Sequence, residues 1–190
     1  MKRLMKHVLV PLALFTPLLL AGCEDKEKSP PPAPFALTSE AMGRYCGMNV
    51  LEHAGPKGQV ILDAQVGEPI WFSSARDTLA FTMLPEEPKD IAAIYVSDMA
   101  KAPSWEKPGA TNWIDARKAF YVIGSSAKGG MGAEEVVPFS TKEAAMQFAG
   151  KNGGRIVSFG EVPRDYVLGT GGTEPSNDAD ASDVKGRDHG

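Results

Sequence analysis

The stretch IWFSSARDTLAF (residues 70–81) decides the fold, because its pattern returns as VPFSTKEAAMQF at residues 137–148. Both stretches begin with apolar residues and a phenylalanine, continue with two hydroxyl residues, and end in a helix-like segment that closes on a second phenylalanine. The two phenylalanines are nine residues apart in each copy. Such a repeat indicates two similar structural units, although a chance resemblance is the alternative.

Short apolar runs flank both copies and predict the strands of each unit. Strands are expected at 59–62, 69–72 and 91–96 in the first unit, and at 119–123, 136–139 and 156–159 in the second. Two strands, a helix and a strand, repeated once, define an α+β protein of two similar small modules packed side by side. We place the first module at residues 35–98 and the second at 111–168, with a proline-containing linker at 99–110.

The two expected helices share their start signals and their apolar faces. Each follows a pair of hydroxyl residues, which suit the N-cap position. Ser74 and Ser140 each have an acidic residue three positions later, which is the spacing of a capping box. Met83 and Met146 fall on the apolar faces expected for these helices, so both are predicted to belong to the core.

Residues 1–22 read as a lipoprotein signal peptide. A basic start precedes a 13-residue apolar stretch, which is too short to cross a membrane. It ends in LAGC at residues 20–23, where small residues suit a signal peptidase and Cys23 offers a thiol for acylation, palmitate included. We expect the mature chain to start at Cys23 and to be held on a membrane by its acyl chains. A general secretion signal with an unrelated cysteine is the alternative.

The segments outside the modules have the composition of a spacer and a tail. Residues 23–34 combine charges with four prolines, which predicts a semi-rigid spacer behind the lipidated cysteine. Residues 169–190 contain almost no large apolar side chains, which predicts a disordered acidic tail. The chain of 190 residues carries a net charge of −4 and shows no basic patch, which argues against nucleic acid as a partner.

Cys46 is left without a disulfide partner once Cys23 is lipidated, and Met48 follows it after a glycine. We expect the segment at the start of a strand or in extended backbone, where residues two apart point to the same face. The two sulfurs would then reach one point, and nearby Arg44 would favour the thiolate. A thiolate and a thioether select Cu(I) over hard ions. A structural zinc site is unsupported, because His53 is the single histidine within the fold.

Two further residues are candidate ligands of the same metal. Met131 lies among glycines in the sequence KGGMG, where it has no apolar neighbours to pack against. If the modules pack side by side, its loop could close over Cys46 and Met48; an exposed methionine without a role is the alternative. His53 follows Cys46 by seven residues and could instead be a histidine satisfied by hydrogen bonds in a turn. We leave Met42 and Met99 unassigned.

The segments YCGMNV (45–50) and HAGPKGQ (53–59) resemble the NosL family, as do FSSARD (72–77), the glycine-bounded methionine and VPF (137–139). Members of this family are copper-binding accessory lipoproteins of nitrous-oxide reductase. The resemblance implies two related modules and a periplasm-facing metallochaperone for Cu(I). It implies Cys46, Met48 and Met131 as ligands, with His53 as a weaker candidate. It also implies ligand exchange with an ABC-type membrane complex (NosDFY-like), which serves the copper centres of apo nitrous-oxide reductase.

Two other classes of function compete with a copper chaperone. Cys46 could act as a nucleophilic or peroxide-reactive thiol in a redox enzyme, but the mature chain has no resolving cysteine. A structural lipoprotein without a ligand would leave the placement of Met48 and Met131 unexplained. We therefore expect a chaperone that is not an enzyme, and the sequence leaves its oligomeric state, its copper affinity and the choice of inner or outer membrane open.

Overall fold

The computed structural model describes residues 30–169. The predicted signal peptide, Cys23 and the tail beyond Gly169 lie outside the described residues. Within the described part of the chain, no helix is long and apolar enough to cross a membrane.

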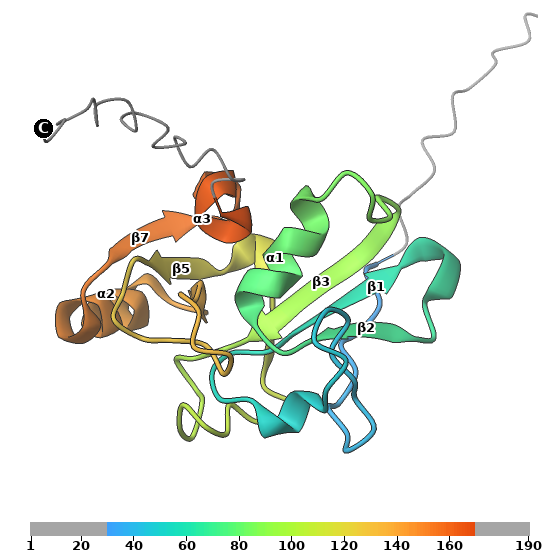
Figure 1. Cartoon of the computed structure of the whole chain (residues 1–190), viewed down its shortest axis with the longest axis horizontal. Coiled ribbons are helices and arrows are strands. Elements are labelled where there is room, and N and C mark those ends of the chain that lie inside the picture. The colour runs from blue at the N-terminus through green and yellow to red at the C-terminus, as the bar shows by residue number, and fades with distance from the viewer. Residues whose placement is uncertain (1–29, 170–190) are drawn as a thin grey trace, which may run out of the picture. The chain divides into compact units, whose positions relative to one another are not determined.

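The first half of the chain forms an antiparallel sheet with one helix against it. Its strands have the order β2-β1-β3-β4. Figure 1 shows α1 lying across the sheet, and it contacts β1, β2 and β3. The elements are β1 (Gly58–Leu62), β2 (Pro69–Phe72), α1 (Ala75–Met83), β3 (Ile91–Ser97) and β4 (Trp113–Asp115).

The second half repeats this arrangement on a smaller scale. Its sheet has the order β6-β5-β7, and α2 contacts all three strands. A short helix, α3, follows and contacts α1 of the first half. The elements are β5 (Phe120–Ile123), β6 (Val137–Phe139), α2 (Lys142–Asn152), β7 (Arg155–Ser158) and α3 (Arg164–Leu168).

The strand orders confirm the prediction of an α+β fold with two similar modules. In each half the first strand is central, the second strand lies on one side of it, and the strand after the helix lies on the other. The aligned stretches quoted above form β2 with α1 and β6 with α2. The repeated sequence pattern therefore corresponds to a repeated ββαβ structure.

The two sheets do not divide where the linker was expected. Strand β4, at Trp113–Asp115, follows the predicted linker but pairs with β3 of the first sheet. The second sheet begins at β5, so the first sheet extends beyond residue 110. Three residues with one aspartate carry too weak an alternation to be read as a strand from sequence.

The two modules share one core. A single cluster of buried apolar residues includes Phe72, Leu79 and Phe81 from the first module together with Tyr121 and Val136 from the second. The rings of Phe72 and Phe81 meet edge to face, with centroids 5.5 Å apart. The apolar face of α1 packs within this shared cluster, so hydrophobic burial holds the two halves together.

The N-cap of α2 corrects one sequence prediction. Ser74 caps α1 as expected, and its hydroxyl accepts a hydrogen bond from the backbone N–H of Asp77 at 2.9 Å. In α2, however, the cap is Thr141, whose hydroxyl accepts from the backbone N–H of Ala144 at 3.2 Å. The prediction of Ser140 was wrong, because the second hydroxyl of each pair is the equivalent position in the repeat.

The two helix methionines differ in burial. Met83 packs against the main core, as expected. Met146 is 57% exposed, so the prediction that it belongs to the core was wrong. In α2 the side chains of Ala144 and Phe148 face the second sheet. Met146 lies two residues from each of them and therefore on the opposite side of the helix.

Candidate metal centre

The segment around Cys46 is a closed turn, not extended backbone. Met42 and Asn49 form an antiparallel bridge at its base. Inside it, the N–H of Gly43 donates to the carbonyl of Met48, and the N–H of Gly47 donates to the carbonyl of Gly43, both at 2.9 Å. Gly47 has φ +64°, a left-handed conformation that glycine adopts without strain. The expectation of an extended Cys-Gly-Met segment was therefore wrong.

The turn leads into a short helical turn where a strand was expected. The side-chain oxygen of Asn49 accepts a hydrogen bond from the backbone N–H of Leu51 at 2.9 Å. This cap starts the 3₁₀ helix Val50–Glu52. Val50 is buried in a small cluster with Leu37 and Ala41, which anchors the turn to the domain. This hydrogen bond from Asn49 to the backbone two residues later outweighs the β propensity of the apolar residues that follow.

The Cys46 turn is attached to the edge of the first sheet. Gly43 forms a parallel bridge with Trp71 of β2, and the N–H of Arg44 donates to the carbonyl of Trp71 at 2.8 Å. A side chain at Gly43 would place its Cβ 2.5 Å from the Cys46 sulfur. The glycine therefore leaves the space that the thiol occupies.

Cys46 is the free cysteine of the described residues, and it is half-buried. Its Sγ lies 3.6 Å from Oγ of Ser73 and 3.9 Å from Nε2 of His53. The backbone carbonyl of Met48 is also 3.9 Å away. The thiol therefore has a hydroxyl and an imidazole beside it.

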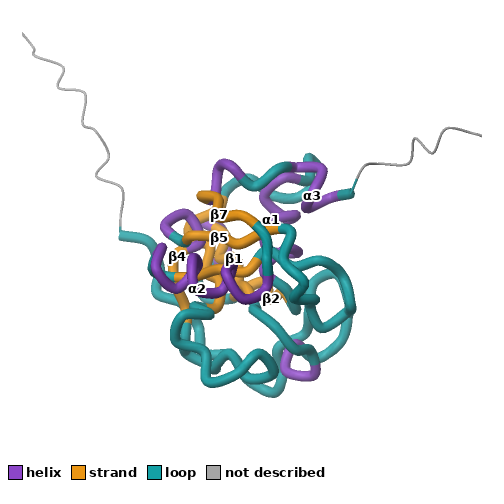
Figure 2. The backbone as a smooth tube through the Cα atoms, turned by 90° about the vertical axis from the view of Figure 1, so that its left-hand side faces the viewer, coloured by secondary structure: helices purple, strands orange, loops and turns teal. Residues whose placement is uncertain are grey.

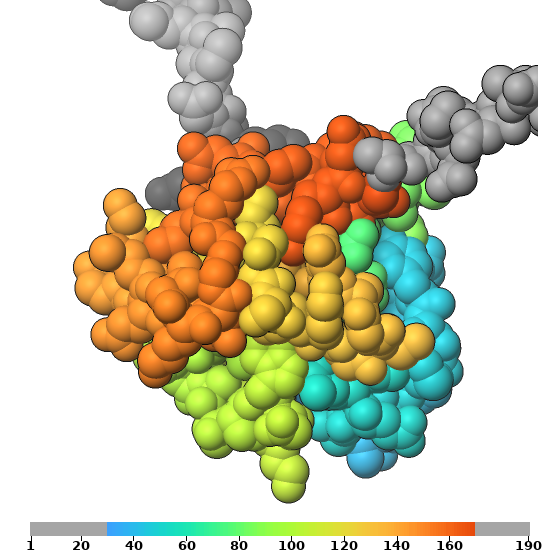
Figure 3. Space-filling view, turned by 60° about the vertical axis from the view of Figure 1, so that its left-hand side comes forward, coloured from blue at the N-terminus to red at the C-terminus, as the bar shows by residue number. Residues whose placement is uncertain are grey.

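The Met131 loop comes from the second module and lies over the first. Lys128 and Glu134 bridge at its base, and Gly132 turns back onto Gly129 through an N–H···O bond of 2.8 Å. At Gly130 the loop touches the His53–Ala54 backbone so closely that a Cβ would lie 2.6 Å from Cβ of His53. In Figure 3 the golden surface of this loop borders the cyan surface of the earlier segment.

One cavity of about 250 Å³ is lined by both Cys46 and Met131. It is lined by residues of the Cys46 turn, the start of α1 and the Met131 loop, namely Tyr45, Cys46, Ser73, Ser74, Asp77, Gly129, Gly130, Met131, Ala133, Glu134 and Glu135. Figure 2 shows, in teal, that much of the loop structure of the described chain gathers on one side of the strands. Residues of both modules thus line one cavity, and the role of Met131 as a ligand stays a prediction.

The four ligands predicted from the sequence do not all lie at the cavity. The structure brings Cys46, His53 and Met131 together, although His53 is only 7% exposed and Met131 is 61% exposed. Met48 is on the same turn as Cys46 but does not line the cavity, and it is 38% exposed. The chain reverses at Gly47 instead of running straight, so the extended geometry that would have pointed both sulfurs to one face is absent.

Arg44 does not serve the thiol as the sequence suggested. Its guanidinium lies 3.2 Å from the carboxylate of Glu87. Glu87 also accepts a hydrogen bond from the Tyr45 hydroxyl at 3.1 Å. Burial and the bond to Glu87 raise the pKa of Tyr45 well above its usual value, so Tyr45 stays neutral and holds the turn against the first module.

Three ionisable residues around the cavity escaped the sequence prediction. Burial raises the pKa of Glu135 to about 8. Its carboxylate accepts hydrogen bonds from the backbone N–H groups of Val136 and Arg76, which lower the pKa but do not offset the burial. Burial also raises the pKa of Asp77 and lowers that of Lys57 to about 8. Glu135 lies two residues before β6, and Lys57 directly precedes β1. Charged residues at the start of buried strands were the available signal for both.

The cavity is lined by the Cys46 thiol and by Met131, and the His53 imidazole lies 3.9 Å from the Cys46 sulfur although His53 does not line the cavity, so the nearby donors are soft to borderline. Such donors suit Cu(I), whereas hard ions such as Mg²⁺ or Ca²⁺ require oxygen ligands. The fold and the cavity together define the class of protein, a small two-module α+β domain with a candidate soft-metal site built from both modules.

Comparison with known proteins places the chain within a family. The family model NosL matches residues 34–167. The copper-binding lipoprotein NosL of Achromobacter cycloclastes is 42% identical over 189 residues, which cover 98% of this chain and 95% of that protein. Its counterpart in Stutzerimonas stutzeri is 36% identical over 154 residues, 80% of this chain and 77% of that protein. The chain belongs to the NosL family.

A solved structure extends the comparison to the fold. The crystal structure of the copper chaperone NosL from Shewanella denitrificans superposes with a TM-score of 0.66 at 36% sequence identity. The match covers 71% of this chain and 98% of that one. The two-module architecture is therefore the fold of the family.

Proposed function

We propose that this protein is a Cu(I) chaperone that carries copper on the site around Cys46. One observation carries the proposal: a single cavity contains Cys46 from the first module and Met131 from the second, with Nε2 of His53 3.9 Å from the Cys46 sulfur. Relatives at 42% and 36% identity are named copper-binding lipoproteins. Copper is here the cargo of the protein.

The proposed ligands are the thiolate of Cys46, the thioether of Met131 and the imidazole of His53, with Met48 as an additional thioether. A thiolate and thioethers stabilise Cu(I), for which a low coordination number with soft donors is favourable. Met48 is two residues from Cys46, so rotation of its flexible side chain brings its sulfur toward the thiol. Bound copper also protects the unpaired thiol from oxidation.

The exposure of the thioethers supports release as well as binding. Met131 and Met48 are both exposed, whereas His53 is buried. An acceptor can therefore approach the copper from the side of the two methionines and add its own ligand before Cys46 and His53 let go. Exchange through a shared intermediate avoids free copper in solution.

Membership of the family supports the remaining parts of the proposal. Acyl chains on Cys23 would hold the protein on a bacterial cell membrane, with the folded domain facing the periplasm. The acceptor would be an ABC-type maturation complex (NosDFY-like), and the final destination the copper centres of apo nitrous-oxide reductase. No group of the described residues forms a cluster of three or more His, Cys, Asp or Glu side chains suited to a metal, so the sulfurs of methionine are essential to this proposal.

A competition titration of purified protein with Cu(I) and a coloured chelator tests the proposal. Cys46→Ser is expected to abolish tight binding, and unchanged affinity in this variant would refute the model. Met131→Leu and Met48→Leu are each expected to weaken binding, because they remove a thioether while nearly conserving volume. Met146→Leu is the matched control, since Met146 is an exposed methionine on α2 and does not line the cavity.

A thiol enzyme is the second candidate function, because an imidazole lies beside the Cys46 thiol and could act as its base. The Cys46 sulfur and Nε2 of His53 are 3.9 Å apart, which leaves room for a metal ion between them. Turnover of a thiol-reactive substrate by the copper-free protein, with no effect of added Cu(I), would support the enzyme instead.

A further inference from the structure

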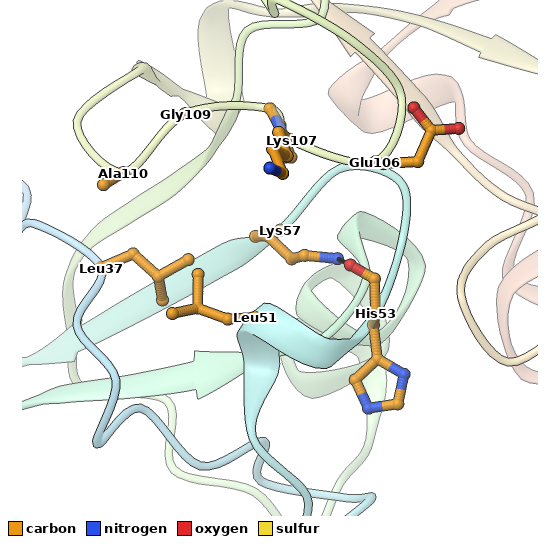
Figure 4. Close-up of a pocket in the computed structure, with 9 residues that line it drawn as sticks. Leu37, Leu51, His53, Lys57, Glu106, Lys107, Gly109 and Ala110 are labelled. Atoms are coloured by element: carbon orange, nitrogen blue, oxygen red, sulfur yellow. Dashed lines mark hydrogen bonds between the residues drawn. The ribbon is translucent and has the colours of Figure 1, made fainter.

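Lys57 is a buried lysine whose ammonium group joins two loops of the site. The side chain is 1% exposed. Its Nζ donates to the carbonyls of His53 at 2.5 Å, Ala54 at 3.1 Å and Ser73 at 3.3 Å. Figure 4 shows the ammonium directed at the His53 carbonyl, with the aliphatic stem along the wall of a neighbouring apolar pocket. The three N–H donors of the ammonium are thus matched by three acceptors.

The backbone of Lys57 is fixed to the first sheet. Its N–H donates to Oγ of Ser97 at 3.0 Å, and the N–H of Ser97 donates to the Lys57 carbonyl at 2.9 Å. Ser97 is the last residue of β3 and is fully buried. The ammonium group therefore extends from a rigid strand end, and its position is set by the sheet.

Both segments that the ammonium binds carry groups beside the Cys46 thiol. The first contributes Nε2 of His53, 3.9 Å from the sulfur, and the second contributes Oγ of Ser73, 3.6 Å from it. In Figure 4 the His53 ring points away from Lys57, on the opposite side from the bound carbonyl. Holding that carbonyl therefore sets the position of the His53 backbone from which the ring extends toward Cys46.

A role in packing alone does not explain a lysine at this position. Burying an ammonium is unfavourable unless it is fully hydrogen-bonded, and an apolar side chain would fill the same space without that penalty. Within residues 30–169, no carboxylate lies within 4.0 Å of the ammonium to form an ion pair. What an apolar side chain cannot do is hold carbonyls of two separate segments at fixed distances.

We propose that Lys57 is a positioning residue of the metal site, which sets His53 and Ser73 around Cys46 by binding the backbone of both segments. The inference rests on the proposed function, because the site it positions is the proposed Cu(I) site. Groups outside the ligand shell that orient a ligand typically account for roughly 10–100-fold in metal affinity.

Lys57→Met tests the role, because it keeps the unbranched stem and removes all three donors. The Cu(I) affinity of the folded variant is expected to fall by roughly 10–100-fold in chelator competition. The absorption band of the copper–thiolate bond is expected to shift, since the ligands around Cys46 change place. Lys57→Gln keeps two N–H donors, and it is expected to lose less affinity and to serve if Lys57→Met does not fold.

Lys89→Met is the matched control. The Lys89 ammonium also binds backbone carbonyls, those of Thr82 and Leu84 at the end of α1, but neither residue lines the cavity. Its Cu(I) affinity is expected to equal that of the wild type even where its thermal stability falls. An equal loss of affinity in both lysine variants would show a general effect of destabilisation and would overturn the proposal.

A double-mutant cycle separates positioning from stability. If Lys57 acts in part through His53, then the loss caused by Lys57→Met shrinks when His53 is already alanine. Full additivity, or a folded Lys57→Met protein that binds as tightly as the wild type, would overturn the role of Lys57 alone. A wild-type protein that takes up no Cu(I) through Cys46 would instead overturn the proposed function.

Discussion

Replacing Gly130 with alanine should move the Met131 loop away from the site. The added methyl carbon would lie 2.6 Å from Cβ of His53 and 2.8 Å from the backbone nitrogen of Ala54. Carbon atoms pack at about 3.5–4.0 Å, so the loop must shift by about 1 Å to relieve the contact. Metal–ligand distances vary by only about 0.2 Å, so this shift is large for a ligand on the loop.

The energy of the shift sets the expected loss of affinity. Overpacking typically costs about 1–3 kcal/mol. If the loop relaxes in the copper-free protein and the strain returns when Met131 binds the metal, the cost corresponds to roughly 5- to 150-fold in Cu(I) affinity. Chelator competition measures the affinity, and thermal unfolding of the copper-free protein measures any loss of stability.

A control glycine separates the clash from a general effect of substitution. Gly150 lies within α2, and a Cβ there would meet no atom within 4 Å. Gly150→Ala is expected to stabilise the protein by about 0.5–1 kcal/mol and to leave Cu(I) affinity unchanged. Wild-type affinity in Gly130→Ala would refute the reasoning, because it would mean that the loop need not approach His53 for copper to bind.

Three further predictions concern stability. Thr141→Ala removes the cap of α2 and should lower the free energy of unfolding by about 1 kcal/mol, whereas an unchanged urea midpoint would count against the cap. Burial tends to raise the pKa of Asp98, but hydrogen bonds from Ser140 and Ala100 and the nearby Lys101 hold it below the usual value. The stabilisation from ionised Asp98 should therefore be present above about pH 4 and be lost as the pH falls through the folded-state pKa, so Asp98→Asn should differ from the wild type at pH 7 and converge with it in acid. The pH dependence expected for Glu135 has the opposite sign. Its pKa is raised to about 8, so its contribution to the free energy of unfolding is fully present below about pH 4.5 and is lost as the pH rises toward 8. Urea unfolding of Glu135→Gln should show a flatter decline over that range, and an identical pH profile would contradict the assignment.

The fold was largely predictable because the signal occurs twice. The alternating and helical patterns of residues 70–81 recur at 137–148, so each copy supported the interpretation of the other. Strand β4 was missed because its three residues lack a pattern of their own. It forms because the edge of β3 is available for pairing, which is a property of the assembled sheet.

The candidate site was predictable in its residue types but not in its geometry. Cysteine and methionine in unusual surroundings identified Cys46 and Met131, and the structure places both at one cavity. The chain reversal at Gly47 was not predicted, because the sequence Cys46-Gly47-Met48 does not reveal that the glycine has a positive φ angle. Lys57 was missed because its function depends on carbonyls from segments that only the fold brings together.

The attachment of the Cys46 turn to Trp71 has a consequence for solubility. Strand β2 is the outer strand of the first sheet, and the bridge from Gly43 with the bond from Arg44 occupies part of its open hydrogen-bonding edge. Uncovered edges invite pairing between molecules and lead to aggregation. The turn that carries the thiol therefore also blocks edge-to-edge association, so variants that unfold this turn should aggregate before they lose the rest of the fold.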